Sequence, residues 1–129
     1  MRRLISFIIL LFLLFACQDS TSPSNNMIFG TWIDNGYDKD GIRILKSSMA
    51  LEKDKGGYIF FENRTLLESK NSGWCGTPPI AYGNYEGIWS IYDENKLEII
   101  SDYWGGIDTV EYEIVNLTDR ELLLKYIIQ

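Results

Sequence analysis

The alternation of apolar and polar residues from Met27 onward limits the fold of this chain more than any other feature. Short runs of β-branched and aromatic residues are separated by Gly, Asn, Asp and Pro, which favour turns. In the clearest run, Tyr85 and Trp89 share one face, while Glu86 and Ser90 share the other. No segment of this region carries the 3.6-residue apolar stripe of an amphipathic helix. The pattern therefore predicts an all-β domain.

The runs predict eight strands joined by short connections. The predicted strands cover Phe29–Asp34, Ile42–Ser47, Gly57–Glu62, Thr65–Ser69, Asn84–Tyr92, Lys96–Asp102, Thr109–Asn116 and Glu121–Ile127. A closed barrel accommodates them best, because closure removes exposed strand edges. We predict a small antiparallel meander barrel of about eight strands, with a two-layer β-sandwich as the alternative. Ser48 to Lys55 contains good helix formers and is expected to hold either strand or one helical turn.

Length and charge restrict the function further. The chain has 129 residues, with 12 basic and 18 acidic side chains and a net charge of −6. Loss of Arg2 and Arg3 with an export segment leaves 10 basic against 18 acidic residues, a net charge of −8. An acidic surface disfavours nucleic acid, whose binding depends on Lys and Arg contacts with phosphates. We expect one small domain over residues 27–129 that binds no nucleic acid.

Residues 1–16 have the features of an export signal. Arg2 and Arg3 precede an apolar stretch from Leu4 to Ala16, which is shorter than the roughly 20 residues of a membrane-spanning helix. Leu14-Phe15-Ala16-Cys17 resembles the lipobox of bacterial lipoprotein signal peptides. This resemblance implies that the chain is cleaved before Cys17 and that fatty acids such as palmitate acylate the Cys17 thiol.

Residues 17–26 are expected to be a flexible tether from the lipidated cysteine. Gln18 to Asn26 contains no apolar side chain, so burial cannot offset the entropy of ordering it. Two or more acyl chains would anchor the protein stably to a bilayer. Gln18 differs from the Asp that retains lipoproteins in the inner membrane of enteric bacteria. We therefore expect an outer-membrane lipoprotein that faces the periplasm or the cell surface.

Several motifs of the predicted domain resemble a known family. Gly30-Thr31-Trp32 resembles the Gly-x-Trp signature of lipocalins, in which the tryptophan closes one barrel end. With Gly57-Tyr58-Ile59-Phe60-Phe61, Trp74-Cys75-Gly76-Thr77-Pro78-Pro79 and Gly87-Ile88-Trp89, the domain is similar to small lipocalin-like lipoproteins of the Bacteroidetes. The chain lacks a clear C-terminal helix and so resembles the compact members. The resemblance implies a barrel with an apolar interior site, and it brings no known ligand.

Two functions are compatible with such a barrel. In the first, the barrel binds a small apolar molecule or a sugar-like ligand. The candidate ligand-binding residues are large aromatics, namely Trp32, Phe60, Trp74, Tyr85, Trp89, Trp104 and Tyr112. In the second, the aromatics fill the interior, and an external face of this protein-interaction subunit docks an envelope partner. An eight-stranded barrel is only just wide enough for a ligand, so both alternatives stay open.

Residues with catalytic or metal-binding chemistry are scarce. The chain has no histidine, so we expect Cys75 to be an inert thiol or to form an intermolecular disulfide. In the run from Asp34 to Gly41, alignment with a calcium loop puts Gly36 and Ser47 at the positions that require carboxylates, and the run predicts a hairpin turn instead. We expect no enzymatic activity, no catalytic residues, no cofactor and no metal site.

Overall fold

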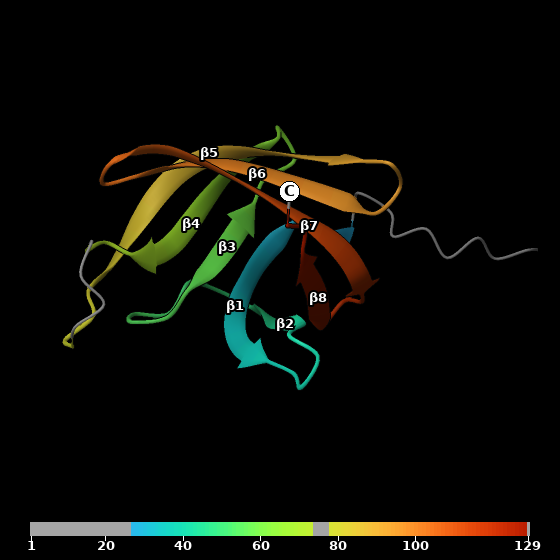
Figure 1. Cartoon of the computed structure of the whole chain (residues 1–129), viewed down its shortest axis with the longest axis horizontal. Coiled ribbons are helices and arrows are strands. Elements are labelled where there is room, and N and C mark those ends of the chain that lie inside the picture. Colours follow the sequence, from blue (N-terminus) through green and yellow to red (C-terminus); the bar gives the residue numbers. More distant parts are fainter. Residues whose placement is uncertain (1–26, 74–77, 129) are drawn as a thin grey trace, which may run out of the picture.

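The computed structural model describes residues 27–73 and 78–128, and these residues form a closed barrel of eight antiparallel strands (Figure 1). The strands are β1 Gly30–Tyr37, β2 Arg43–Ser48, β3 Gly57–Phe60, β4 Thr65–Asn71, β5 Tyr82–Tyr92, β6 Lys96–Tyr103, β7 Gly106–Leu117 and β8 Glu121–Tyr126. No helix in this part of the chain is long and apolar enough to span a membrane.

The structure confirms the predicted eight-stranded barrel. Each predicted strand overlaps an observed one, and the ring of pairings closes between β1 and β3, so the β-sandwich alternative is wrong. The helical turn considered for Ser48–Lys55 is also wrong. Residues 49–56 form the connection from β2 to β3, which contains a turn at Lys53 and Asp54. Asp54 has a φ of 62° there, a left-handed conformation that Asp tolerates better than most residues.

The strand order departs from a simple meander in one place. Strands β3 to β8 lie side by side in sequence order, but β1 lies between β2 and β3, and β2 pairs with β8. The connection 49–56 must therefore pass β1 to reach β3. An up-and-down barrel of the lipocalin type pairs each strand with the next one. The described barrel differs from that arrangement in the positions of β1 and β2.

The antiparallel pairing gives the barrel two distinct ends. Strands β1, β4, β6 and β8 run in one direction, and their four neighbours run in the other. We call the end that holds Asp34, Arg43 and Lys70 the polar end, because these residues lie late in β1, at the start of β2 and late in β4. The opposite end, where Ile28 precedes β1, is called the apolar end. The chain thus enters the domain at the apolar end.

One apolar cluster fills the barrel. Its buried members are Ile28, Trp32, Leu45, Tyr58, Phe60, Leu66, Trp89, Leu97, Ile99, Tyr112, Ile114, Leu117, Leu122 and Leu124. The two buried indoles also satisfy their polar atoms: Trp32 Nε1 donates to the Ile28 carbonyl at 2.8 Å, and Trp89 Nε1 donates to the Phe61 and Thr65 carbonyls at 3.2 and 3.1 Å. These bonds hold the segment before β1 and the β3–β4 turn against the core, since buried donors require partners.

Gly87 allows β5 and β6 to approach each other closely in the barrel wall. It pairs with Ser101, and a Cβ atom at this position would lie 2.4 Å from the Ile100 carbonyl oxygen and 2.8 Å from Ser101 Cβ. A glycine inside a strand commonly marks such an approach or a bend.

We expect Gly87→Ala to lower the free energy of unfolding by about 1–3 kcal/mol, because backbone atoms of β6 must move to admit the methyl group. Gly56→Ala is the matched control, since its Cβ would meet atoms only at 3.5 Å and beyond. The control should unfold within about 0.5 kcal/mol of the parent or be slightly more stable. Urea unfolding followed by tryptophan fluorescence measures both, and equal midpoints for the two variants would contradict the close approach.

Candidate functional site

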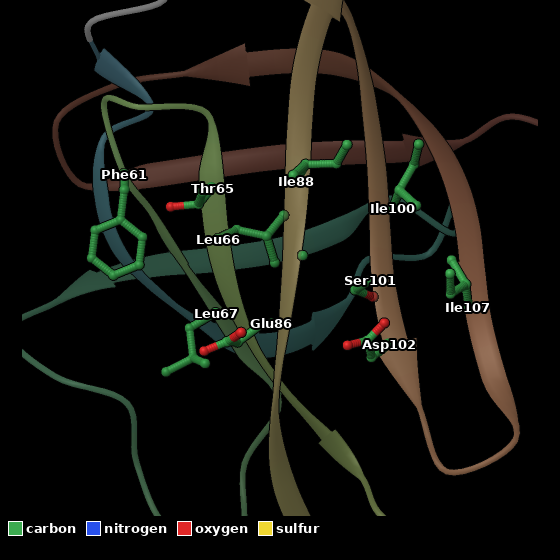
Figure 2. Close-up of a pocket in the computed structure, with 11 residues that line it drawn as sticks. Phe61, Thr65, Leu66, Leu67, Glu86, Ile88, Ile100, Ser101, Asp102 and Ile107 are labelled. Carbon is green, nitrogen blue, oxygen red and sulfur yellow. The ribbon is translucent and has the colours of Figure 1, made fainter.

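The principal pocket of the described residues lies on the outer face of the barrel wall, over β4, β5 and β6 (Figure 2). Its volume is about 660 Å³, which is within the usual range of ligand sites. The lining residues are Phe61, Thr65, Leu66, Leu67, Glu86, Gly87, Ile88, Ile100, Ser101, Asp102 and Ile107. We call this pocket the outer groove.

The outer groove combines apolar side chains with two carboxylates. Ile88 is 53% exposed and Ile107 is 71% exposed, which is unusual for large aliphatic residues on the outer face of a sheet. Glu86 and Asp102 lie on β5 and β6, two residues from Ile88 and Ile100 and therefore on the same outer face. In Figure 2, Glu86 lies close to Leu67 of β4, and Asp102 lies on the Ile107 side of the groove. The groove therefore suits a ligand with an apolar body and a positive charge.

Most of the predicted ligand-binding aromatics contact one another in the core. Trp32, Phe60, Trp89 and Tyr112 have exposed fractions of 2%, 1%, 3% and 9%. The Phe60 and Trp89 rings pack edge to face, with their centroids 5.4 Å apart. These four residues thus occupy the barrel interior as packing side chains.

The other predicted ligand-binding aromatics are arranged differently. Tyr85 is half-buried at the polar end, where Lys70 Nζ lies 5.4 Å from its ring centroid. Trp104 is 58% exposed in the turn between β6 and β7 and packs edge to face against Tyr103. Trp74 lies outside the described residues, as do Cys17 and Cys75. The structure therefore does not gather the predicted set into one site.

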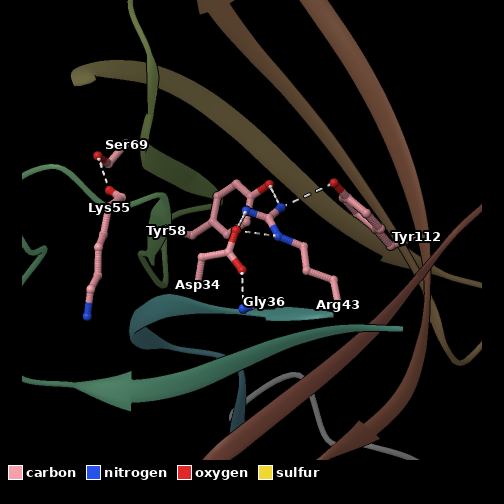
Figure 3. A network of polar contacts seen from close by, with 7 residues as sticks. All are labelled: Asp34, Gly36, Arg43, Lys55, Tyr58, Ser69 and Tyr112. Atoms are coloured by element: carbon pink, nitrogen blue, oxygen red, sulfur yellow. Dashed lines mark hydrogen bonds and ion pairs between the residues drawn. The ribbon is translucent and has the colours of Figure 1, made fainter. Parts of the chain in front are cut away.

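A charged network lies inside the barrel at its polar end (Figure 3). Arg43 donates from Nε and Nη2 to Asp34 Oδ2 at 3.1 and 2.9 Å. Its Nη1 donates to the hydroxyls of Tyr58 at 2.8 Å and Tyr112 at 3.3 Å. The guanidinium thereby links β1, β2, β3 and β7 around the interior. An arginine has five donors in a planar fork, which suits such a bridge.

The environment of this network shifts two pKa values. Burial acts to lower the pKa of Arg43, but interactions with Tyr58, Tyr112 and Asp34 outweigh it, so the pKa is raised above its ordinary value. Burial raises the pKa of the Tyr58 hydroxyl well above its ordinary value, although Arg43 opposes this effect. Arg43 is therefore a fixed positive charge, and the Tyr58 hydroxyl stays neutral at neutral pH while it accepts a hydrogen bond from Arg43.

A second charged group lies beside the first. Glu68 Oε2 accepts hydrogen bonds from Ser101 Oγ at 2.5 Å and Lys70 Nζ at 3.0 Å, and Lys70 Nζ lies 2.8 Å from Ser101 Oγ. Ser101 is only 3% exposed. Lys70 and Glu68 form an ion pair here, and both side chains are largely buried. These hydrogen bonds join β4 to β6, and the three side chains cover the polar end of the barrel interior.

In the run from Asp34 to Gly41, residues 34–37 end β1 and residues 38–41 form the turn toward β2, so the predicted hairpin turn is confirmed at the second half of the run. Asp38 Oδ1 accepts the backbone N–H groups of Asp40 and Ile42 at 2.8 and 2.9 Å, while Asp34 is engaged by Arg43. Within residues 27–73 and 78–128, no group of three or more His, Cys, Asp or Glu side chains is placed to hold a metal ion.

Sequence reasoning missed both the outer groove and the charged network. One available signal for the groove was Ile88, an apolar residue on the otherwise polar face of β5, beside a glycine within a strand. For the network, Glu68 and Lys70 share the inner face of β4 with buried Leu66, at alternate positions. Comparison with known proteins gives no match to a family model, to a curated protein or to a solved structure.

We expect Asp34→Asn to lower the free energy of unfolding by about 2–3 kcal/mol, because it leaves a largely buried guanidinium without its counter-charge. Glu121→Gln is the control, since Glu121 pairs with Lys46 on the exposed surface. The control should cost about 0–1 kcal/mol. Urea unfolding at neutral pH measures both, and equal losses would show that the Arg43 pair is no stronger than a surface pair.

We expect alkaline pH to destabilise the fold through Tyr58. Because its pKa is raised on folding, the native state keeps a proton that the unfolded chain releases. The resulting stabilisation is complete below the unfolded pKa of about 10 and is lost as pH rises above it. Tyr58→Phe should be less stable at pH 7 by about 1.5–3 kcal/mol but should lose less stability between pH 9 and 11. Unfolding curves of both proteins across this pH range test the prediction. Parallel pH profiles of stability for the parent and for Tyr58→Phe would refute it.

Proposed function

We propose that the protein is a lipid-anchored interaction module of the bacterial cell envelope, and that its outer groove docks a partner protein. In this proposal, Cys17 carries the lipid, residues 17–26 form the tether, and the barrel presents the groove. The observation that supports it most is the exposed apolar surface of the outer groove. Ile88 and Ile107 are left open to solvent there, beside two carboxylates. Exposed apolar patches of this kind mark interaction sites.

The packed interior favours a protein partner over a small molecule inside the barrel. Trp32, Phe60, Trp89 and Tyr112 would line an interior site, but they pack into the same cluster as the aliphatic core. A small apolar or sugar-like ligand would have to displace this packing. Protein interiors are packed as densely as organic crystals, and they resist such displacement. The external face is therefore the better candidate surface.

Charge favours a partner segment that is apolar and basic. Glu86 and Asp102 both line the groove, and none of its lining residues is Lys or Arg. The whole chain is also acidic, with a net charge of −6. Complementary charge speeds encounter and suppresses binding of acidic partners. The partner segment is therefore expected to carry Lys or Arg next to aliphatic side chains.

The position of the groove agrees with a tether at Cys17. The chain enters the barrel at the apolar end through Ile28, whereas the groove extends along β5 and β6 to Ile107, near the start of β7 at the polar end. A lipid anchor before residue 27 would leave that part of the groove directed away from the membrane.

Photo-cross-linking of the full-length lipoprotein in its own host tests this function. A photoreactive amino acid replaces Ile88 in the groove or, as a control, Val115, an outer-face residue of β7 with a similar exposed fraction of 48%. We expect adducts from position 88 at least about tenfold more abundant than from position 115, because only position 88 contacts the partner. The cross-linked partner peptide should contain aliphatic and basic residues.

Two outcomes would contradict the proposal. Equal yields from positions 88 and 115 would show that the groove is no preferred contact. A small molecule retained by the purified lipoprotein in native mass spectrometry, with no protein adduct from position 88, would favour ligand binding instead.

A further inference from the structure

The barrel wall divides into two arms beside the outer groove. Strands β5 and β6 pair from Tyr92 and Lys96 as far as Gly87 and Ser101, where their ladder ends. Beyond this point, Tyr82–Glu86 of β5 pairs with β4 alone, and Asp102 and Tyr103 of β6 pair with β7 alone. We call the opening between these arms the fork. Its base, formed by Glu86, Gly87, Ser101 and Asp102, is part of the groove lining.

The fork exposes one edge of β5. In an antiparallel ladder, alternate residues direct both backbone groups toward the same neighbouring strand. The Trp89 N–H donates to the Arg64 carbonyl, and the Ala81 carbonyl accepts from the Ser72 N–H, so odd-numbered residues of β5 face β4. The backbone groups of Tyr82, Asn84 and Glu86 therefore face the fork, where no strand of the described residues pairs with them. All three residues are exposed.

Like charge disfavours closure of this edge by β6. If the ladder continued past Gly87 and Ser101, Glu86 and Asp102 would form the next cross-strand pair on the outer face. Like charges directly opposite each other destabilise strand pairing. A segment that brings a positive charge between them would remove this repulsion. The fork therefore favours pairing with a basic strand over pairing with the continuation of β6.

Resting on the proposed function, we propose that the partner binds by strand addition: an extended segment enters the fork and pairs antiparallel with Tyr82–Glu86 of β5. Its backbone bonds to Tyr82, Asn84 and Glu86, which span about 13 Å at 3.3 Å per residue. An outward-facing Lys or Arg of the segment lies between Glu86 and Asp102. Aliphatic side chains two residues away, on the same face of the segment, cover Ile107 and the rest of the groove.

Defined peptides binding to the full-length lipoprotein in detergent test the inference. The first probe, called the valine-lysine peptide, is an eight-residue peptide with one lysine at an outward-facing position, valine at the other outward-facing positions and threonine at the inward-facing positions. The second probe is a pair of peptides with the same side chains and N-methyl groups on alternate backbone nitrogens. One peptide is methylated at the odd positions and the other at the even positions, so one of the two cannot pair with β5 while its groove contacts remain. The third replaces lysine with glutamate. We expect the N-methylated peptides that block the β5-facing edge to bind about tenfold or more weakly, since they lose several hydrogen bonds, and the acidic peptide to bind weakest.

A protein variant tests the same edge from the other side. Asn84→Pro removes an N–H that faces the fork and leaves the β4 ladder intact, because proline is tolerated where the missing donor faces solvent. Asn84→Ala is the matched control. We expect the proline variant to bind the valine-lysine peptide about tenfold more weakly and the alanine variant to bind within about twofold of the parent. In the parent, the Asn84 and Glu86 amides should gain protection from hydrogen exchange on peptide binding, while the Tyr85 amide should not change.

The results separate this inference from the proposed function. Equal binding of all N-methylated peptides, with no new amide protection, would overturn strand addition while leaving groove docking intact. If the valine-lysine peptide fails to bind at millimolar concentration, strand addition is overturned, and the cross-linking yields from positions 88 and 115 decide the proposed function separately. If Asn84→Pro does not fold, the peptide series and the exchange pattern on the parent protein still give the answer.

Discussion

The narrow interior of an eight-stranded barrel is the constraint on which the rest of this structure depends. Such a barrel encloses a space that side chains can fill, and here Trp32, Tyr58, Phe60 and Trp89 fill much of it. The aromatic interior stabilises a chain that has too few residues for a large core. It also leaves the exposed apolar pocket on the outer face of the wall. The outer groove and the packed core are therefore two consequences of the same closure.

Each charged side chain inside the barrel needs a partner, just as each apolar side chain needs close packing. Arg43 is bound by Asp34 and two tyrosine hydroxyls, and Glu68 is bound by Ser101 and Lys70. Every buried side-chain nitrogen and oxygen of the described residues has a hydrogen-bond partner. Buried charges are costly unless paired in this way. The polar end is thus built as a closed network whose members depend on one another, and a substitution at one position leaves another charge without its partner.

The sequence predicts the strands well because each one depends on local alternation and turn residues, as the run around Trp89 illustrates. The position of β1 between β2 and β3 could not be predicted, because pairing between distant strands leaves no mark on local periodicity. The ligand hypothesis placed Trp32 and Tyr112 correctly on the inner face but could not tell a lined cavity from a filled one. That difference depends on side-chain volumes across the barrel. The outer groove depends on Gly87 and Ile88, whose meaning appears only once β6 lies beside them.

At the fork, the same residues can both protect the β5 edge and determine which strands are able to pair with it. An exposed strand edge invites pairing with other chains, and proteins usually block it with charge. Here Glu86 and Asp102 place two negative charges at the point where the β5–β6 ladder ends. These charges repel an acidic edge and attract a basic one, and a neutral strand leaves their mutual repulsion unrelieved. In a chain with a net charge of −6, the same charges also disfavour pairing between two copies of the protein. Under the proposed strand addition, selectivity for a basic, extended partner would follow from the same residues that protect the edge from aggregation.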